Sequence, residues 1–134
     1  KRDWSSDVCS SDLVAGTFDR VLIDAPCSGL GALRRRPDAR WHVEPDDVDE
    51  LAALQARIIA ACAPLVRPGG VLVYSVCTLT ARESVDHPVP VGFEAQEPLG
   101  APWERIGDAA RLVPDRFDGD GMVVRRWVRT VATT

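Results

Sequence analysis

The chain has 134 residues, which allows one domain with a modest core, and none of its apolar runs is long enough to span a membrane. No secretory signal is visible, the net charge of −4 argues against a general polyanion-binding protein, and the four cysteines fit no zinc spacing. These features predict a protein of the reducing cytoplasm, with no disulfide framework, no metal site and no association with a membrane.

The N-terminal segment has neither helical nor strand periodicity. Residues 1–13, KRDWSSDVCSSDL, are rich in Ser and Asp and read like a translated sequencing adapter joined to a truncated reading frame. The alternative is a native disordered terminus. Under both interpretations the chain divides into this tail and a domain from residue 14 to residue 134, and Cys9 has no assigned role.

Two apolar runs predict neighbouring strands of a parallel sheet. Residues 18–25 form the first run, and Pro26 cannot continue a ladder; residues 71–75 form the second. Pro45 suits the first turn of a helix between them, and residues 67–70, RPGG, are expected to end it. The helix itself is indicated by apolar side chains at helical spacing, namely Val48, Leu51, Leu54, Ile58, Cys62 and Leu65.

The remaining chain is less regular. Residues 81–117 are rich in Pro, Gly and charge and predict at most a short strand near Phe93, whereas residues 122–128 predict a terminal strand after a turn. The positive charge is clustered, so RNA is not excluded as a partner. The clusters are Arg34, Arg35, Arg36 and Arg40 in the loop that runs to His42, and Arg125, Arg126 and Arg129 near the C-terminus.

Cys27 and Cys77 each follow one of the two predicted parallel strands. The carboxyl ends of the strands form the reaction crevice of an open α/β sheet, and adjacent strands lie about 4.8 Å apart. The two thiols are therefore expected to share one cleft, where they could carry thiol chemistry on a bound substrate. Cys62, inside the predicted helix, is expected to fill the core.

The segments DAPCSGLG and, about fifty residues later, YSVCTLT resemble motifs IV and VI of the RNA cytosine-C5 methyltransferases of the Sun/Nop2 type, which include the bacterial 16S ribosomal RNA enzyme. The resemblance covers residues 17–128. It implies an α/β fold, namely a partial Rossmann-like class I methyltransferase sheet that holds only the C-terminal strands. It also implies that the glycine-rich loop for S-adenosylmethionine and the acidic residue for its ribose are missing from this chain.

The resemblance further implies S-adenosylmethionine as the cofactor and RNA, ribosomal RNA in particular, as the substrate. Cys77 would attack cytosine C6, and Cys27 would assist release of the product. Asp24 would bind the cytosine edge and lie at the cofactor. The other implied contacts are Pro26, Ser28 and Gly29 in the substrate pocket and Arg34, Arg35, Arg36 and Arg40 on the RNA.

Simpler interpretations stand beside these roles. Asp24 could close a loop or cap a helix, the arginine loop could be a solvated surface, and Trp41 or His42 could pack rather than stack on a base. For the whole chain, one alternative is an inactive truncated fragment, and another is a thiol redox protein that uses Cys27 and Cys77. The sequence identifies no target nucleotide.

Overall fold

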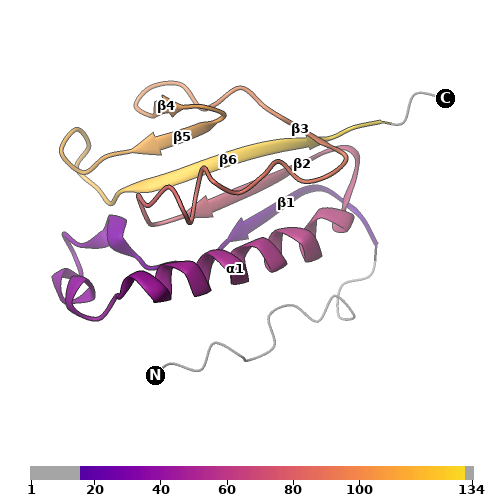
Figure 1. The fold of residues 1–134 in the computed structure, drawn as a ribbon. Helices are drawn as coiled ribbons and strands as arrows, with labels where there is room; N and C mark the ends of the chain where they lie inside the picture. Colours follow the sequence, from indigo (N-terminus) through magenta and orange to yellow (C-terminus); the bar gives the residue numbers. More distant parts are fainter. Residues whose placement is uncertain (1–15, 132–134) are drawn as a thin grey trace.

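The structure is a computed structural model, and it describes residues 16–131. Within this range six strands form one mixed sheet, and the long helix α1 packs against it (Figure 1). The predicted α/β class and the partial Rossmann-like sheet are confirmed. The tail predicted for residues 1–13 lies outside the described residues.

The strand order is β1-β2-β6-β5-β4, with β3 also paired to β6. The pair β1–β2 is parallel, and every other pair in the described sheet is antiparallel. The elements are β1 (Phe18–Asp24), 3₁₀ turns at Leu30–Ala32 and Pro37–Trp41, α1 (Pro45–Cys62), a 3₁₀ turn at Ala63–Leu65, β2 (Val66–Val76), β3 (Phe93–Ala95), β4 (Glu104–Ile106), β5 (Ala109–Leu112) and β6 (Met122–Arg129).

Helix α1 begins where the sequence indicates. Pro45 occupies the first turn, and the Glu44 side chain accepts the Asp47 backbone N–H while the Asp47 carboxylate accepts that of Glu44. This reciprocal pair satisfies two N–H groups that the helix leaves without partners. The helix connects two parallel strands, so it returns the chain to the end of the sheet at which β1 began.

The core lies between α1 and the central strands. Tyr74 of β2 and Trp127 of β6 are fully buried and stack with ring centroids 6.0 Å apart. Burial of such rings and of the aliphatic side chains around them drives folding. Cys62 packs in this core, as the sequence predicts. The other buried apolar residues of the cluster are Ile23, Ala25, Leu54, Ile58, Ile59, Val66, Leu72, Val76, Ala109 and Val123.

The predicted boundary between α1 and β2 is wrong. The helix ends at Cys62 because Pro64 lacks the N–H that the next turn requires, and a 3₁₀ turn follows. Strand β2 then begins at Val66, so residues 67–70 belong to the strand instead of terminating the helix. The two glycines allow an irregular pairing here, and the register of β1 against β2 shifts between Phe18 and Arg20.

The prediction of at most one short strand between residues 81 and 117 is wrong, because the structure has more strands there. Strand β3 lies at Phe93 as expected, but β4 and β5 also form. They contain three and four residues, too few for a period of two to appear in the sequence. Both depend on pairing, β5 with β6 and β4 with β5.

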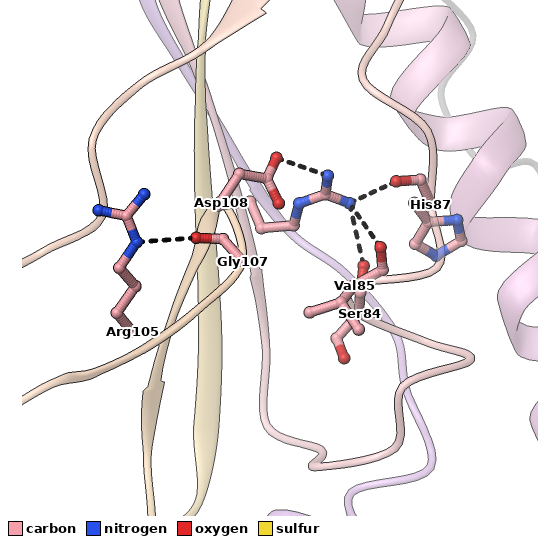
Figure 2. A network of polar contacts seen from close by, with 7 residues as sticks. Ser84, Val85, His87, Arg105, Gly107 and Asp108 are labelled. Carbon is pink, nitrogen blue, oxygen red and sulfur yellow. Dashed lines mark hydrogen bonds and ion pairs between the residues drawn. The ribbon is translucent and has the colours of Figure 1, made fainter.

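The C-terminal arginines do not form a free basic patch. Arg125 is 3% exposed on the inward face of β6. Its guanidinium donates to the backbone carbonyls of Ser84, Val85 and His87 and to the Asp108 carboxylate at 2.7 Å (Figure 2). The two other arginines of the cluster also donate to carbonyl oxygens, Arg126 to Glu97 and Arg129 to Val66. The cluster therefore holds loops to the sheet.

Candidate active site

The two thiols predicted to share a cleft lie side by side. The Sγ atoms of Cys27 and Cys77 are 3.4 Å apart, both residues are partly buried, and both thiols are free. They follow β1 and β2, whose carboxyl ends point to the same end of the sheet (Figure 1). The parallel ladder continues past the strand, since the Ala25 N–H donates to the Ser75 carbonyl at 3.0 Å.

Three loops are fastened together around the thiols. The Gly31 N–H donates to the Cys77 carbonyl at 3.0 Å, and the Gly121 N–H donates to the Gly31 carbonyl at 2.8 Å. A Cβ atom at position 31 would lie 2.1 Å from the Gly121 oxygen and 2.9 Å from the Cys77 oxygen. Only glycine fits this position, so the contact depends on a residue without a side chain.

The pKa values of the two thiols shift in opposite directions. A hydrogen bond from Cys27 lowers the pKa of Cys77 to about 6, against the opposing effects of burial and of the negative charges on Asp24 and Asp120. The same bond, together with burial, raises the pKa of Cys27. The lowered pKa favours the thiolate form of Cys77, and only the thiolate is nucleophilic. Cys27 remains a thiol that donates to it.

The other predicted pocket residues lie around this pair. Asp24 is exposed at the end of β1, and its charge acts on Cys77. The Pro26 carbonyl accepts the side-chain amide of Gln55 at 2.9 Å, and Gly29 has a φ of 71°, in the left-handed region that favours glycine. Ser28 is buried, and its hydroxyl is directed to Glu83 at 2.6 Å. Whether these residues form a substrate pocket stays a prediction.

Glu83 and Gln55, both fully buried, were not predicted from the sequence as part of the site. The Glu83 carboxylate accepts hydrogen bonds from the loops of both cysteines, and Gln55 reaches it from α1 at 3.3 Å. Gln55 could have been noticed as a polar residue inside the apolar stripe of the helix, between Leu51 and Ile58. Glu83 lies in a polar loop and has no comparable pattern.

The arginine loop is only partly available to a ligand. Arg34 pairs with Asp118, and Arg35 pairs with Asp120 through both carboxylate oxygens, the longer contacts being 2.9 and 3.0 Å. Arg36 and Arg40 are both exposed. The Arg40 guanidinium lies 4.7 Å from the centre of the Trp41 ring. Trp41 is 72% exposed, so it does not pack in the core.

A separate apolar pocket of about 510 Å³ lies beside the C-terminal half of α1 and includes no cysteine. Within residues 16–131 no group of His, Cys, Asp and Glu side chains is arranged to hold a metal ion, and no helix is long and apolar enough to cross a membrane. The thiol pair at the strand ends is thus the chemically distinctive site of the described domain.

Comparison with known proteins assigns this chain to a family. A family model described as 16S rRNA methyltransferase RsmB/F matches residues 3–88. The chain is 49% identical over 116 residues to ribosomal RNA small subunit methyltransferase B of Serratia proteamaculans, covering 84% of this chain and 26% of that protein. It is 45% identical over 107 residues to the protein of that name from Xanthomonas campestris, covering 77% and 24%.

A solved structure agrees with this relationship. The crystal structure titled NSun6 from Pyrococcus horikoshii with SFG superposes with a TM-score of 0.74 at 27% identity, covering 90% of this chain and 32% of that one. The chain therefore spans about a quarter of these two curated relatives and about a third of the structural neighbour. On the family match and this fold, the chain belongs to the RsmB/F family of 16S rRNA methyltransferases.

Proposed function

We propose that this chain provides the nucleophile and the product-release thiol of an S-adenosylmethionine-dependent RNA cytosine-C5 methyltransferase acting on ribosomal RNA in the cytoplasm. The observation that carries the proposal is the 3.4 Å contact between Cys27 and Cys77, with the pKa of Cys77 lowered to about 6. The family and its named relatives support the methyltransferase class and the ribosomal RNA substrate.

The thiolate makes an unreactive carbon nucleophilic. Cys77 adds its electron pair to C6 of cytosine, the C5–C6 double bond opens, and C5 becomes able to accept a methyl group. S-adenosylmethionine supplies that group when bound. A base then removes the C5 proton, the double bond re-forms, and the Cys77 sulfur leaves with the electrons of its bond to C6.

Cys27 suits the release step because its thiol can donate to the departing sulfur. The hydrogen bond that lowers the pKa of Cys77 also makes Cys77 a better leaving group, since both effects stabilise the thiolate. Asp24, exposed at the strand end beside Cys77, can bind the N3/N4 edge of the ring and stabilise charge that develops there. Arg34, Arg35, Arg36 and Arg40 would contact RNA phosphates.

The described residues fit the cofactor only in part. Asp24 is an acceptor beside the nucleophile and can meet one polar group of S-adenosylmethionine. A relative's structure carries SFG, an analogue of S-adenosylmethionine, which supports use of this cofactor by the whole protein.

The test uses a chimera, because the chain spans about a quarter of its relatives. Residues 16–131 replace the matching part of the Serratia proteamaculans protein, and the chimera is incubated with S-adenosylmethionine and labelled ribosomal RNA. Cys77→Ala should abolish both methylation and the covalent adduct. Cys27→Ala should accumulate a protein–RNA adduct that survives a denaturing gel, because release is slowed.

Two alternatives predict different results in this experiment. Thiol–disulfide exchange is favoured by the same 3.4 Å contact, and it predicts that either substitution has the same effect and that no RNA is trapped. An inactive fragment predicts methylation by the unsubstituted chimera and none by the isolated chain. If Cys77→Ala trapped RNA and Cys27→Ala did not, the roles of the two cysteines would be reversed.

A further inference from the structure

We propose that Glu83 is a positioning residue that sets the separation of the two active-site thiols by binding the residue that follows each cysteine. The proposal deepens the function proposed above and rests on it. Glu83 lies in the loop after β2, six positions beyond Cys77, and its side chain is fully buried. It touches neither sulfur in the described contacts, so it acts through its neighbours.

One carboxylate joins the two cysteine loops. Its Oε1 accepts the Ser28 backbone N–H at 2.7 Å, and its Oε2 accepts the Ser28 hydroxyl at 2.6 Å and the Thr78 hydroxyl at 3.2 Å. The Ser28 and Thr78 hydroxyls lie 3.0 Å from each other. The residues after Cys27 and after Cys77 are thus held by the same group, although they are 50 positions apart in sequence.

Neutral hydrogen-bond donors, and not a cation, surround the Glu83 carboxylate in the described contacts. Thr80 donates to Glu83 at 2.7 Å and the Gln55 amide donates at 3.3 Å, and no ion pair of Glu83 occurs among the described residues. Hydrogen bonds to a buried carboxylate are about twice as strong as neutral ones, and each donor must keep its place for the charge to stay satisfied. Both loops are therefore held tightly.

Several contacts fix the position of Glu83 itself. The Tyr74 hydroxyl donates to the Glu83 backbone carbonyl at 2.7 Å. Arg125 holds backbone carbonyls of the residues that follow Glu83, and Figure 2 shows those of Ser84, Val85 and His87 directed toward one guanidinium nitrogen. Gln55 completes the arrangement from α1. Its amide also donates to the Pro26 carbonyl, and its oxygen contacts His87 Nε2 at 3.1 Å.

A small displacement of either loop would change the chemistry, because the thiol–thiolate bond is sensitive to distance. Without the carboxylate the Cys27 donor would separate from Cys77, and the thiolate would lose its main stabilisation. No other side chain donates a hydrogen bond to the Cys77 sulfur among the described contacts. The charged and titratable groups that act on the two thiols are Asp24, Asp120, Arg35 and Tyr74.

The experiment measures the pH dependence of iodoacetamide labelling at each cysteine of this chain by peptide mass spectrometry. Native Cys77 should react with a midpoint near pH 6. In Glu83→Gln the amide group keeps the shape but turns N–H donors toward the donors of Ser28, Thr78 and Thr80. The midpoint of Cys77 should then rise by about two pH units, toward that of an ordinary thiol.

Two comparisons separate positioning from loss of folding. Glu104→Gln makes the same chemical change at a carboxylate that binds Arg111 and Arg116, away from the thiols, and should leave the midpoint unchanged. Cys62, 9% exposed in the core, reports unfolding, because it should stay protected as long as the domain is folded.

If Glu83→Gln unfolds the domain, so that Cys62 becomes labelled, Thr78→Val tests the positioning role of Glu83 instead. It removes one donor without changing the side-chain shape, and it should raise the midpoint by a smaller amount. An unchanged Cys77 midpoint in the folded Glu83→Gln protein, or in Thr78→Val, would overturn the proposal. The assay needs neither RNA nor cofactor. A shifted midpoint without adducts in the chimera would therefore contradict only the methyltransferase mechanism.

Discussion

The parallel and antiparallel halves of the sheet contribute differently to the site. The unit β1–α1–β2 supplies both sulfur atoms at the ends of regular strands. The segment from β3 to β6 contains no cysteine, yet it contacts the cysteine loops through Gly121 and the Glu83 loop through Arg125. The reactive groups come from one half, and the other half holds their loops through Gly121 and Arg125.

This division has a physical reason. Parallel neighbouring strands bring two residues that are distant in sequence to within one strand spacing, which is what a thiol pair needs. The carboxyl ends of the strands are then irregular loops whose polar backbone groups need partners. Strand β6 runs antiparallel beside β2, so its beginning lies close to those loops (Figure 1).

Replacement of Arg125 should have the largest effect on stability. Arg125→Met leaves the Asp108 carboxylate and the carbonyls of Ser84 and His87 without their donor, and the guanidinium also lies over the Trp127 ring at 4.8 Å. We expect the free energy of unfolding to fall by about 3 kcal/mol, as for a broken buried ion pair. Urea unfolding of the purified chain measures it.

The matched control is Arg126→Met on the next residue of β6. Arg126 is only half-buried and donates to one carbonyl, that of Glu97. Its loss should cost about 1 kcal/mol or less. Equal losses at the two positions would show that the antiparallel half does not hold the Glu83 loop through Arg125.

Gly31→Ala should have the next largest effect, because position 31 is where the two halves touch. The new methyl group would lie 2.1 Å from the Gly121 oxygen, so backbone must move. We expect a loss of about 2 kcal/mol, typical of overpacking, and a rise in the pH midpoint of Cys77 labelling as its carbonyl contact is lost.

The neighbouring Gly29→Ala is the comparison for that substitution. No atom lies within 4 Å of a Cβ at position 29, so only the φ of 71° opposes the change. That strain costs about 1 kcal/mol, less than the close contact at position 31. Should Gly29→Ala destabilise the chain more than Gly31→Ala, close packing between the loops would not be the main constraint.

The parts of the fold that could be predicted are those with an unbroken pattern. Residues 21–23 and 71–74 are unbroken apolar runs, and α1 has an apolar stripe and an N-terminal proline. The adjacency of Cys27 and Cys77 follows from parallel pairing. The family assignment follows from the sequence around these cysteines and is confirmed. Each of these features is local or needs one topological rule.

The parts that could not be predicted depend on contacts across the sheet. Nothing adjacent in sequence indicates that Glu83 faces Ser28, and Arg125 reads as surface charge until its place between Val123 and Trp127 on the inward face of β6 is known. The burial alternation of β6 was available as a signal, but it conflicts with the usual exposure of arginine. Polar residues inside a core are specified by partners distant in the chain.

The arginine loop should have the smallest effect on stability and the clearest effect on RNA. Arg36 and Arg40 are exposed, and neither forms an ion pair among the described residues. In the chimera, Arg36→Ala and Arg40→Ala should each lower the slope of log affinity against log salt by about 0.7, with stability changed by less than about 0.5 kcal/mol. Fluorescence anisotropy with labelled RNA at several salt concentrations measures the slopes.

Arg35→Ala should differ from both, because Arg35 already has a partner. Its guanidinium binds Asp120 and lowers the pKa of that carboxyl through the hydrogen bond. A phosphate would have to displace Asp120, so the salt slope should change less than at Arg36. Loss of Arg35 instead removes a positive charge that faces Cys77 and leaves Asp120 unneutralised, and both changes raise the pKa of Cys77. A full reduction in slope with an unchanged labelling midpoint would show that Arg35 contacts RNA and not the thiol site.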